Sequence, residues 1–346
     1  MKVTMASYQA VSILKGGPSI QLRRTAEHLK RLGVEVGFLP QWEEFKPADQ
    51  DLVHVFAAGL GTYHLVRELH ALGVRTVVSP IMFSTHGPSF ISRGLQMTRL
   101  MQRAWPGLWT DYGMMADTCA WARHIVPNSQ AEADLVREGL GIPAAKITVV
   151  PNGVEERFMQ GDASLFTERY GVRDFVLNVG HIGHGRKNVL NLIRALAEID
   201  RPAVIIGRII AGEYGDACVR EAKRHAHIML IDGLQNDSPM LASAYAACDT
   251  FVLPSLFETP GIAALEAGLA GAKVVITPHG GTTEYFGDDA VYVDPVSIAS
   301  IRDGIRVALA RPRGEQLRNR IRARYLWSHV ASLTKSVYER VLAEER

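Results

Sequence analysis

The sequence has few cysteines and no long apolar run. Its three cysteines, Cys119, Cys218 and Cys248, lie far apart and show no C-x-x-C spacing. An odd number of scattered cysteines argues against a disulfide framework or a zinc site and is typical of buried thiols in a reducing compartment. The N-terminus is broken early by Gly16-Gly17, and no stretch of 18 or more apolar residues follows. We therefore expect a cytoplasmic chain with neither a secretion signal nor a membrane span.

The sequence also has little net charge. Its formal charge is +2 over 346 residues, with 47% hydrophobic and 21% charged residues. A nucleic-acid-binding protein usually carries a clustered basic stripe, so this balance argues against a nucleic-acid partner. The composition is that of a globular protein, and the length suits two domains of ordinary size.

Short β-branched runs alternate with amphipathic helical patterns almost from end to end. In the first helical pattern, apolar residues from Ile20 to Leu32 recur at helical spacing, and Gly33 ends it. The pattern restarts at Asp174 with "DFVLNVG". This alternation predicts an α/β fold with two Rossmann-like, doubly wound domains, 1–155 and 156–325, that bind ligands beyond the carboxyl ends of their strands.

Two glycine-rich turns are candidate phosphate sites. Gly16 and Gly17 stand between the first predicted strand and the first helix, where they favour either a phosphate at the helix start or merely a tight turn. The dinucleotide fingerprint G-x-G-x-x-G is absent there, which argues against a hydride-transfer enzyme.

The second turn, "LNVGHIGHGRKNVLNLIRAL", places His181, His184, Arg186 and Lys187 at a loop-to-helix junction. Adjacent cations at the positive end of a helix favour an anion between them, such as a diphosphate. Two solvated surface cations are the alternative.

The stretch "SLFETPGIAALEAGLAGAKVVI" carries two carboxylates around a predicted helix start near Pro260. Proline loses nothing at a first helical position, and the free amides that follow can receive a phosphate or a sugar hydroxyl. Glu258 precedes this start, and Glu266 lies on the apolar helix, where a carboxylate needs a buried partner such as a ribose diol. The amides belong to Gly261, Ile262 and Ala263.

These motifs together resemble a known enzyme family. The E-x7-E spacing of Glu258 and Glu266, "PGIAALEA" between them, "TPHGGTTEYF" downstream and "NVGHIGHGRKN" upstream are similar to the retaining glycosyltransferases of the GT-B fold, family four (glycosyl transferases group 1). "IVPNSQAEADLV" and "KITVVPNGV" also resemble that family. The resemblance covers essentially the whole chain and is strongest from Ile125 to Pro295. It also implies that a C-terminal helix, 326–346, packs back toward the first domain.

The resemblance implies roles for individual residues in donor binding. Glu258 would accept hydrogen bonds from the transferred sugar, and Glu266 would hold the donor ribose. Lys187 would neutralise the leaving diphosphate. His181 stands where the family usually has an arginine, and Arg186 is the candidate substitute. The remaining implied donor contacts are the amides of Gly261, Ile262 and Ala263 and the loop of Gly16 and Gly17, which would close over the phosphates.

The resemblance further implies a metal-independent hexosyltransferase that uses a nucleoside diphosphate sugar and no cofactor. His86 is the candidate active-site residue near the transferred sugar, with a loop histidine of no function as the alternative. The acceptor class stays open among glycans, lipid-linked compounds and small molecules. Two other functions stay open as well: a catalytically silent sugar-nucleotide-binding protein, suggested by His181, and a nucleotide-sugar epimerase of the same fold.

The segment "PSFISRGLQMTRLMQRAWPGLW", residues 88–109, combines apolar, aromatic and arginine residues. It is either an interfacial helix that contacts an anionic bilayer through residues 90–109, giving peripheral attachment to the cytoplasmic membrane face, or a core helix with a polar outer side.

Overall fold

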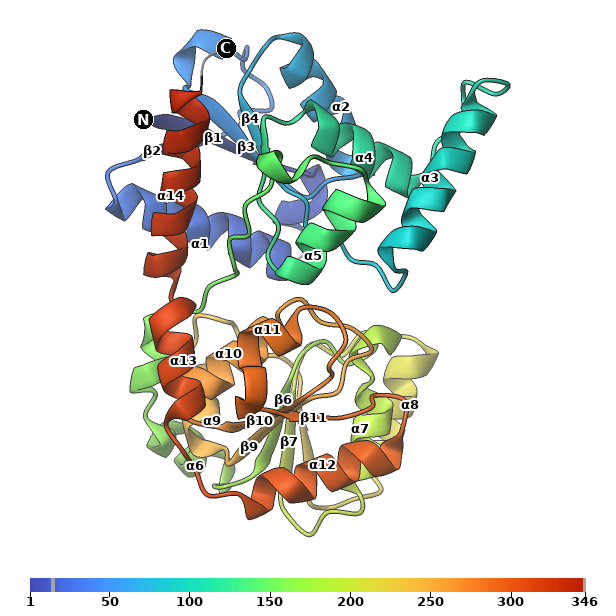
Figure 1. Ribbon diagram of the computed structural model, residues 1–346. Coiled ribbons are helices and arrows are strands. Elements are labelled where there is room, and N and C mark those ends of the chain that lie inside the picture. Colours follow the sequence, from blue (N-terminus) through green and yellow to red (C-terminus); the bar gives the residue numbers. More distant parts are fainter. Residues whose placement is uncertain (14–15, 345–346) are drawn as a thin grey trace. The chain divides into compact units, whose positions relative to one another are not determined.

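The computed structural model describes residues 1–13 and 16–344, which form two compact units. Unit 1 contains Met1–Gly153 together with the chain from Trp327 onward, and unit 2 contains Val154–Leu326 (Figure 1). The sequence placed the corresponding breaks after residues 155 and 325. Each unit has its own parallel sheet with helices packed on it. The predicted fold class, α/β with two doubly wound parallel sheets, is confirmed.

Unit 1 is built on a five-stranded parallel sheet, in the order β2-β1-β3-β4-β5 over the residues described. β3 is buried along its whole length, as a central parallel strand covered on both faces should be. The strands are β1 (Lys2–Ser7), β2 (Glu35–Phe38), β3 (Leu52–Phe56), β4 (Thr76–Ser79) and β5 (His124–Ile125).

The helices of unit 1 bury one apolar stripe each. In α1, Leu22, Ala26 and Leu29 are buried at helical spacing and join the core of the sheet. The helices of this unit are α1 (Gly17–Arg31), α2 (Leu60–Ala71), α3 (Pro88–Gln102), α4 (Asp111–Trp121), α5 (Gln130–Asp134) and α14 (Trp327–Ala343), with a π-helical turn, η3 (Leu135–Gly139), after α5.

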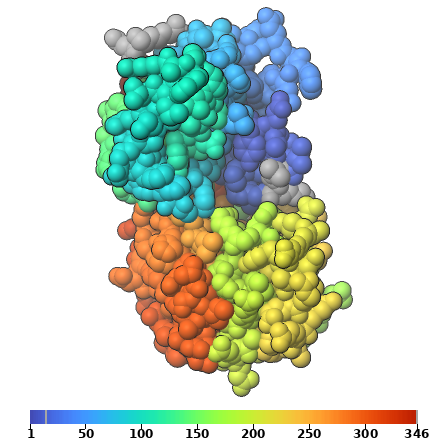
Figure 2. Space-filling model, turned by 90° about the vertical axis from the view of Figure 1, so that its right-hand side faces the viewer, coloured from blue at the N-terminus to red at the C-terminus, as the bar shows by residue number. Residues whose placement is uncertain are grey.

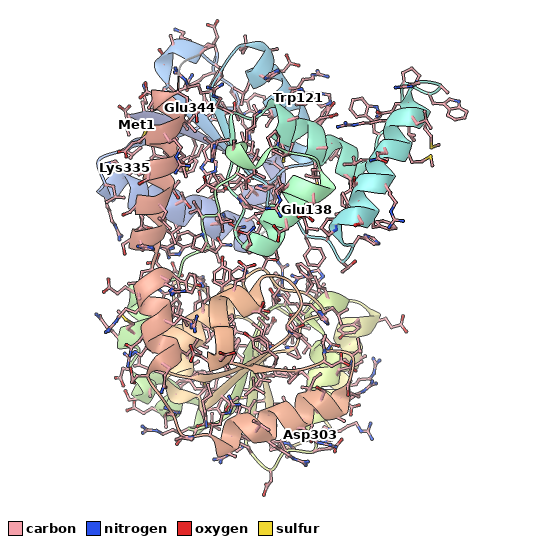
Figure 3. All side chains as sticks on the ribbon, in the orientation of Figure 1. Met1, Trp121, Glu138, Asp303, Lys335 and Glu344 are labelled. Carbon is pink, nitrogen blue, oxygen red and sulfur yellow. The ribbon has the colours of Figure 1, made fainter. Side chains whose placement is uncertain are left out.

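The C-terminal helix α14 is part of unit 1. It packs against α1, and the ammonium of Lys335, labelled in Figure 3, donates to the carbonyl of Leu32 at the end of α1, at 3.1 Å. The buried Tyr338 hydroxyl of α14 lies 2.6 Å from Nδ1 of His54 in β3. Burial lowers the pKa of His54 to about 3, so this contact is made by a neutral imidazole.

Unit 2 has a six-stranded parallel sheet, again counted over described residues, in the order β11-β10-β9-β6-β7-β8. β6 and β9 lie side by side, and the chain extends from them in opposite directions across the sheet, as in a dinucleotide-binding fold. The strands are β6 (Val176–Val179), β7 (Ala203–Ile206), β8 (Ile228–Ile231), β9 (Thr250–Leu253), β10 (Lys273–Ile276) and β11 (Val291–Tyr292).

Helices cover both faces of this sheet, and the core of unit 2 accordingly divides into two apolar clusters. One contains Phe251 and the buried side of α10, and the other contains Val252 and the buried side of α7. The helices are α6 (Ala163–Tyr170), α7 (Val189–Leu196), α8 (Glu213–Ala222), α9 (Pro239–Ala247), α10 (Ile262–Leu269), α11 (Thr282–Phe286), α12 (Ile298–Ala310) and α13 (Gln316–Arg324).

The three cysteines are free and buried, as predicted. Burial raises the pKa of Cys119 to about 12 and that of Cys218 to about 11, so both thiols stay protonated. Within residues 1–13 and 16–344, none of the helices combines the length and apolar character needed to cross a bilayer.

Candidate active site

The candidate site lies at the carboxyl ends of β6 and β9. These two strands are neighbours, and the chain continues from β6 toward one edge of the sheet and from β9 toward the other. Open α/β sheets bind ligands at such a topological switch point. The loop after β6 carries His181, Arg186 and Lys187, and the loop after β9 carries Glu258. The topology therefore brings together residues that are about 70 positions apart in the sequence, as the contacts below show.

Glu258 is buried between the two cations of the β6 loop. Its Oε1 lies 2.5 Å from the Lys187 ammonium and 3.4 Å from the Arg186 guanidinium. Burial raises the pKa of Glu258, but the charges of Lys187 and Arg186 and the hydrogen bond from Lys187 outweigh this effect and hold the pKa below its ordinary value. The carboxylate is therefore ionised at neutral pH.

This ion pair gives the two cations an anionic partner within the protein. The sequence favoured an external anion between them, with solvated surface cations as the alternative. In the structure the anion is the protein's own carboxylate, and the Lys187 side chain is only 19% exposed, whereas that of Arg186 is 42% exposed. Arg186 also donates to the Phe257 carbonyl at 2.8 Å, and its own carbonyl accepts from the Leu256 amide at 2.9 Å. The two loops are therefore joined by main-chain as well as ionic contacts.

Asn188 holds this pair of loops to a third. It adopts a left-handed conformation, with φ 57°, directly before α7, which asparagine tolerates better than most residues. Its buried side-chain amide donates to the carbonyls of Pro254 at 3.0 Å and Pro295 at 2.5 Å. Nothing in the sequence pattern singled out this residue, although it directly follows Lys187.

The main chain of Glu258 is fixed by the loop after β10. The Glu258 amide donates to the His279 carbonyl and the Gly281 amide donates to the Glu258 carbonyl, both at 3.1 Å. Gly280 between them has φ 101°, and a β-carbon there would lie 2.0 Å from the Glu258 carbonyl oxygen. Gly280 of "TPHGG" therefore permits the close approach of this loop to Glu258.

Replacing Gly280 with alanine should destabilise the protein by about 1–3 kcal/mol more than the same change at Gly271. Gly271 has a similar φ of 95° but open space around its would-be β-carbon, so it controls for backbone strain. Thermal unfolding of the two variants measures the difference. Equal melting temperatures would show that the Glu258 loop moves aside freely, contrary to the contacts described here.

The helix after Glu258 starts later than predicted. α10 begins at Ile262, not near Pro260, because Gly261 at the N-cap has φ 82°, a left-handed conformation that cannot continue into a helical turn. The Thr259–Pro260 peptide bond is cis. The first bond of the helix runs from the Ala264 amide to the Gly261 carbonyl, at 2.8 Å. The amides of Gly261, Ile262 and Ala263, which were the predicted phosphate ligands, therefore precede the bonded turns.

Glu266 is buried on α10 with polar protein partners. The Asn236 amide donates to its Oε1 at 2.9 Å, and the Tyr245 hydroxyl donates to its Oε2 at 2.8 Å. Burial raises the pKa of Glu266 to about 7, although both hydrogen bonds and the charge of Arg157 oppose this shift. The prediction of a buried partner is correct, but the sequence did not identify Asn236 or Tyr245, because both lie on other elements.

His181 does not supply the arginine charge that it replaces. Burial and the neighbouring His184, Lys187, Arg208 and Arg186 lower its pKa, so the ring is neutral at pH 7. The rings of His181 and His184 meet edge to face, with centroids 5.5 Å apart. The cationic groups around His181 are therefore Lys187, Arg208 and Arg186.

The other predicted site residues belong to unit 1. Gly16 is the N-cap of α1 and Gly17 its first residue. Gly16 has an extended backbone, φ −176°, with no atom near a would-be β-carbon, so a tight turn does not require glycine there. His86 is an exposed loop residue whose Nδ1 lies 3.1 Å from the Tyr112 hydroxyl and whose ring stacks on Phe90.

The site holds no recognisable set of metal ligands among the residues described: no group of three or more histidine, cysteine or carboxylate side chains comes together. The chemical resources of the site are a buried ion pair, free helix-start amides and a protonatable carboxyl group. Such a site suits an anionic ligand that also carries hydroxyl groups.

Comparison with known proteins identifies matching families for both halves of the chain. The family "Glycosyl transferases group 1" matches residues 167–325, and "Glycosyltransferase Family 4" matches residues 38–158. An MMP alpha-(1->4)-mannosyltransferase from Mycolicibacterium hassiacum is 25% identical over 84% of this chain and 73% of its own length. The chain spans about half the length of other relatives, among them a glycogen synthase from Mycobacterium tuberculosis, which is 29% identical over 62% of this chain and 53% of its own length.

Solved structures show the same fold. Sucrose-phosphate synthase from Thermosynechococcus elongatus superposes with a TM-score of 0.76 and 16% identity over 99% of both chains. The Anabaena protein HepE, solved in complex with UDP and glucose, gives a TM-score of 0.68 and 18% identity over 98% of this chain and 100% of its own.

Proposed function

Because the chain belongs to the glycosyl transferases of group 1 and has the GT-B fold, we propose that it transfers a sugar from a nucleoside diphosphate sugar to an acceptor hydroxyl, with retention of the anomeric configuration and without a metal ion. The acceptor is a glycan, a lipid-linked compound or a small molecule. The solved relative with bound UDP and glucose supports a donor of this class.

The observation that carries this proposal is the buried contact of Glu258 with Lys187 and Arg186 at the β6/β9 switch point. By the family resemblance, a diphosphate bound beside Lys187 and Arg186 would also contact the main-chain amides at the start of α10. Glu258 would then be released from Lys187 to accept hydroxyl hydrogen bonds from the sugar. Glu266, further along α10, would accept those of the ribose.

In the proposed reaction the bond between the anomeric carbon and the diphosphate oxygen breaks, and the nucleoside diphosphate leaves with the electron pair. The acceptor oxygen attacks the anomeric carbon from the face that the leaving group vacates, and its proton passes to the departing phosphate. The protein's part is to stabilise the charge that develops on the diphosphate, for which Lys187, Arg186 and the helix-start amides are suited. No side chain is assigned as a general base.

Release of nucleoside diphosphate tests this function. We expect the purified protein to release UDP, GDP or ADP from one donor of a panel in an acceptor-dependent manner, and to be thermally stabilised by the same nucleotide. Stabilisation without release or sugar conversion would indicate the silent sugar-nucleotide-binding protein. Conversion of the donor to its epimer with no acceptor would indicate the epimerase. No stabilisation by any of these nucleotides would contradict the donor site itself.

A further inference from the structure

Helix α3 of unit 1 exposes an apolar face. It buries Ile91, Leu95 and Thr98 on one side, where it packs against η3 and α4. Four of its apolar side chains are 39–59% exposed: Phe90, Met97, Leu100 and Met101. The exposed positions of α3 also include the polar residues Arg93, Gln96 and Arg99. The exposed surface of α3 therefore combines apolar side chains with basic and polar ones.

The exposed face continues into an ordered loop, and residues 97–109 are called the tip segment below. The Trp105 amide donates to the Met101 carbonyl at 2.9 Å, and the Gln102 side chain donates to the Leu108 carbonyl at 2.8 Å. Trp105 is 64% exposed, while Trp109 packs edge-on against Tyr63 of α2. In Figure 1 the end of α3 and this loop stand away from the rest of unit 1, and Figure 2 turns the segment toward the viewer in cyan and teal.

The surroundings of this face are cationic. Residues 82–110 contain no aspartate or glutamate, and they contain three exposed arginines: Arg93, Arg99 and Arg103. In the part of the chain that the structure describes, none of the three forms an ion pair, although the charge of Arg99 reaches Asp117 on α4.

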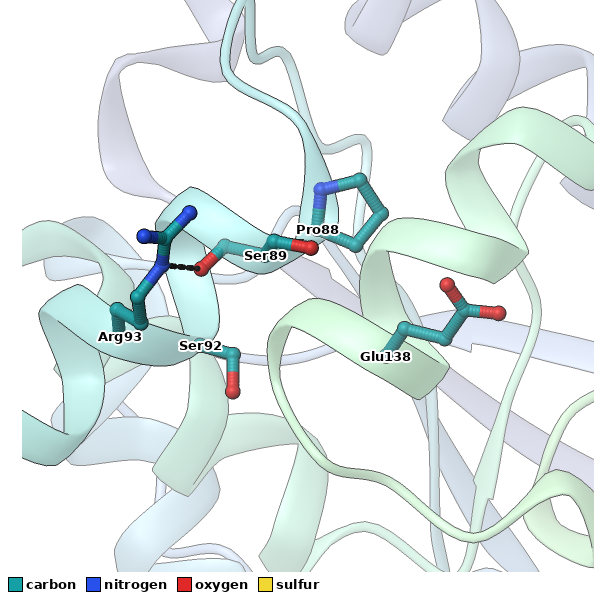
Figure 4. Close-up of a pocket in the computed structure, with 5 residues that line it drawn as sticks. All are labelled: Pro88, Ser89, Ser92, Arg93 and Glu138. Carbon is teal, nitrogen blue, oxygen red and sulfur yellow. Dashed lines mark hydrogen bonds between the residues drawn. The ribbon is translucent and has the colours of Figure 1, made fainter.

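Arg93 lies at the other end of α3 from the tip segment. Figure 4 shows its guanidinium folded back on the Ser89 carbonyl, at 3.1 Å, beside a pocket of about 410 Å³ that Glu138 lines from η3. Glu138 pairs with Arg137 at 2.6 Å. Glu138 thus lies at the base of the helix, Asp117 on α4 is within the reach of Arg99, and the tip segment itself combines apolar and aromatic side chains with Arg99 and Arg103.

We propose that the tip segment docks on the surface of an anionic lipid bilayer. Leu100, Met101 and Trp105 would enter the interface between headgroups and acyl chains, where tryptophan is favoured, and Arg103 would lie among anionic headgroups. A second copy of this chain is a poorer occupant, because a symmetric contact would bring like charges together. A polar protein surface would leave the apolar side chains without partners.

This inference deepens the proposed function and rests on it, because docking on a bilayer would bring the enzyme to an acceptor carried on a lipid. The vesicle binding itself needs no donor and no catalysis. It can therefore fail while sugar transfer succeeds, and the reverse.

Co-sedimentation with vesicles tests the docking. We expect the full chain to bind vesicles of phosphatidylcholine with 30% phosphatidylglycerol at least 10-fold more strongly than pure phosphatidylcholine vesicles at low salt, and more weakly as salt is added. The double variant Leu100→Ser/Trp105→Ser should lose at least 10-fold of this binding. Its matched control is Leu72→Ser/Trp42→Ser, which removes a leucine and a tryptophan of equal or greater exposure (59% and 95%) from the same unit.

Several results would overturn the proposal. They are no binding by the wild-type chain, equal binding to both kinds of vesicle, or the same loss in the control variant as in the tip variant. A dimer in light scattering that Leu100→Ser/Trp105→Ser converts to a monomer, without vesicle binding, would assign the face to a second copy. Circular dichroism and melting temperature confirm that both double variants are folded.

Discussion

Replacing Lys187 with methionine is expected to lower kcat/KM for sugar transfer about 100-fold, equivalent to about 2.7 kcal/mol of transition-state stabilisation. Lys187 is the least exposed cation at the β6/β9 switch point, and its ammonium already contacts a carboxylate oxygen at 2.5 Å. A charge held in a largely buried position interacts more strongly with the charge that develops on a leaving diphosphate than an exposed one would. Methionine keeps most of the side-chain volume and removes the charge.

Loss of a buried ion pair also lowers the stability of the folded protein, and a variant at a second lysine serves as the control for this effect. Lys273 pairs with Asp249 at 2.8 Å and is 13% exposed, so its environment is close to that of Lys187 (2.5 Å, 19%). Lys273→Met should destabilise unit 2 by a similar amount, because each change leaves a largely buried carboxylate without its nearest cation. Its kcat/KM should stay within about twofold of wild type, since Lys273 opens β10 and is not at a strand's carboxyl end.

Steady-state kinetics with a saturating acceptor, together with melting curves for both variants, separate the two effects. If Lys187→Met retains a third or more of the wild-type kcat/KM, the diphosphate is not stabilised by this residue. If Lys273→Met loses as much activity as Lys187→Met, the loss reflects stability and not charge at the site.

The sequence could predict the fold and the placement of Glu258 and the cationic loop at one site, but not their direct contact. Because the carboxyl ends of parallel strands all lie at the same end of a sheet, the loops that follow them come together there. The strand order then requires only that β6 and β9 be neighbours, which the dinucleotide-binding topology implies. Lys187 and Glu258 consequently lie at one site, although the motif gave no distance between them.

The sequence could not predict which protein groups satisfy the buried carboxylates. Asn236 stands in a loop and Tyr245 on α9, and neither follows a spacing rule relative to Glu266. The later start of α10 was missed because Pro260 is acceptable at a first helical position by local rules, whereas the left-handed Gly261 decides the boundary. The sequence could not decide whether α3 is an interfacial helix or a core helix, because periodicity locates the apolar positions but does not show what covers them.

Replacing Glu266 with glutamine should remove a pH dependence of stability that the wild-type protein shows. Burial raises the folded-state pKa of Glu266 from 4.5 to about 7. The folded state therefore holds this proton in a pH range where the unfolded chain has lost it, and stability falls as pH rises from about 4.5 to about 7. The expected fall is about 3 kcal/mol for this carboxyl alone, with no further contribution above pH 7.

The charged and polar groups around Glu266 determine where this change occurs. The hydrogen bonds from Asn236 and Tyr245 and the charge of Arg157 favour the ionised form, and Glu155 opposes it. Urea unfolding of wild type and Glu266→Gln at pH 5, 6, 7 and 8 isolates the contribution, because the other titrating groups are common to both proteins. Parallel stability curves across this range would show that Glu266 titrates normally, contrary to its burial.

The protonation state of the Glu266 carboxyl group should also control donor binding. A ribose diol donates to an ionised carboxylate, so affinity for the nucleotide identified by thermal shift is expected to rise about 10-fold between pH 6 and pH 8. Glu266→Gln should bind at least 10-fold more weakly at pH 8, with a flat profile, because an amide has one acceptor oxygen in place of two.

The Tyr245→Phe variant tests whether the pH profile of donor affinity arises from titration of Glu266 or from a general effect of pH on the protein. It removes one donor to the Glu266 carboxylate and leaves the buried ring in place, so the pKa of Glu266 rises further and the midpoint of the affinity profile moves to higher pH. Calorimetric titration at each pH measures that midpoint. An unmoved midpoint in Tyr245→Phe, or a wild-type profile retained in Glu266→Gln, would assign the titration to another group and remove Glu266 from the donor site.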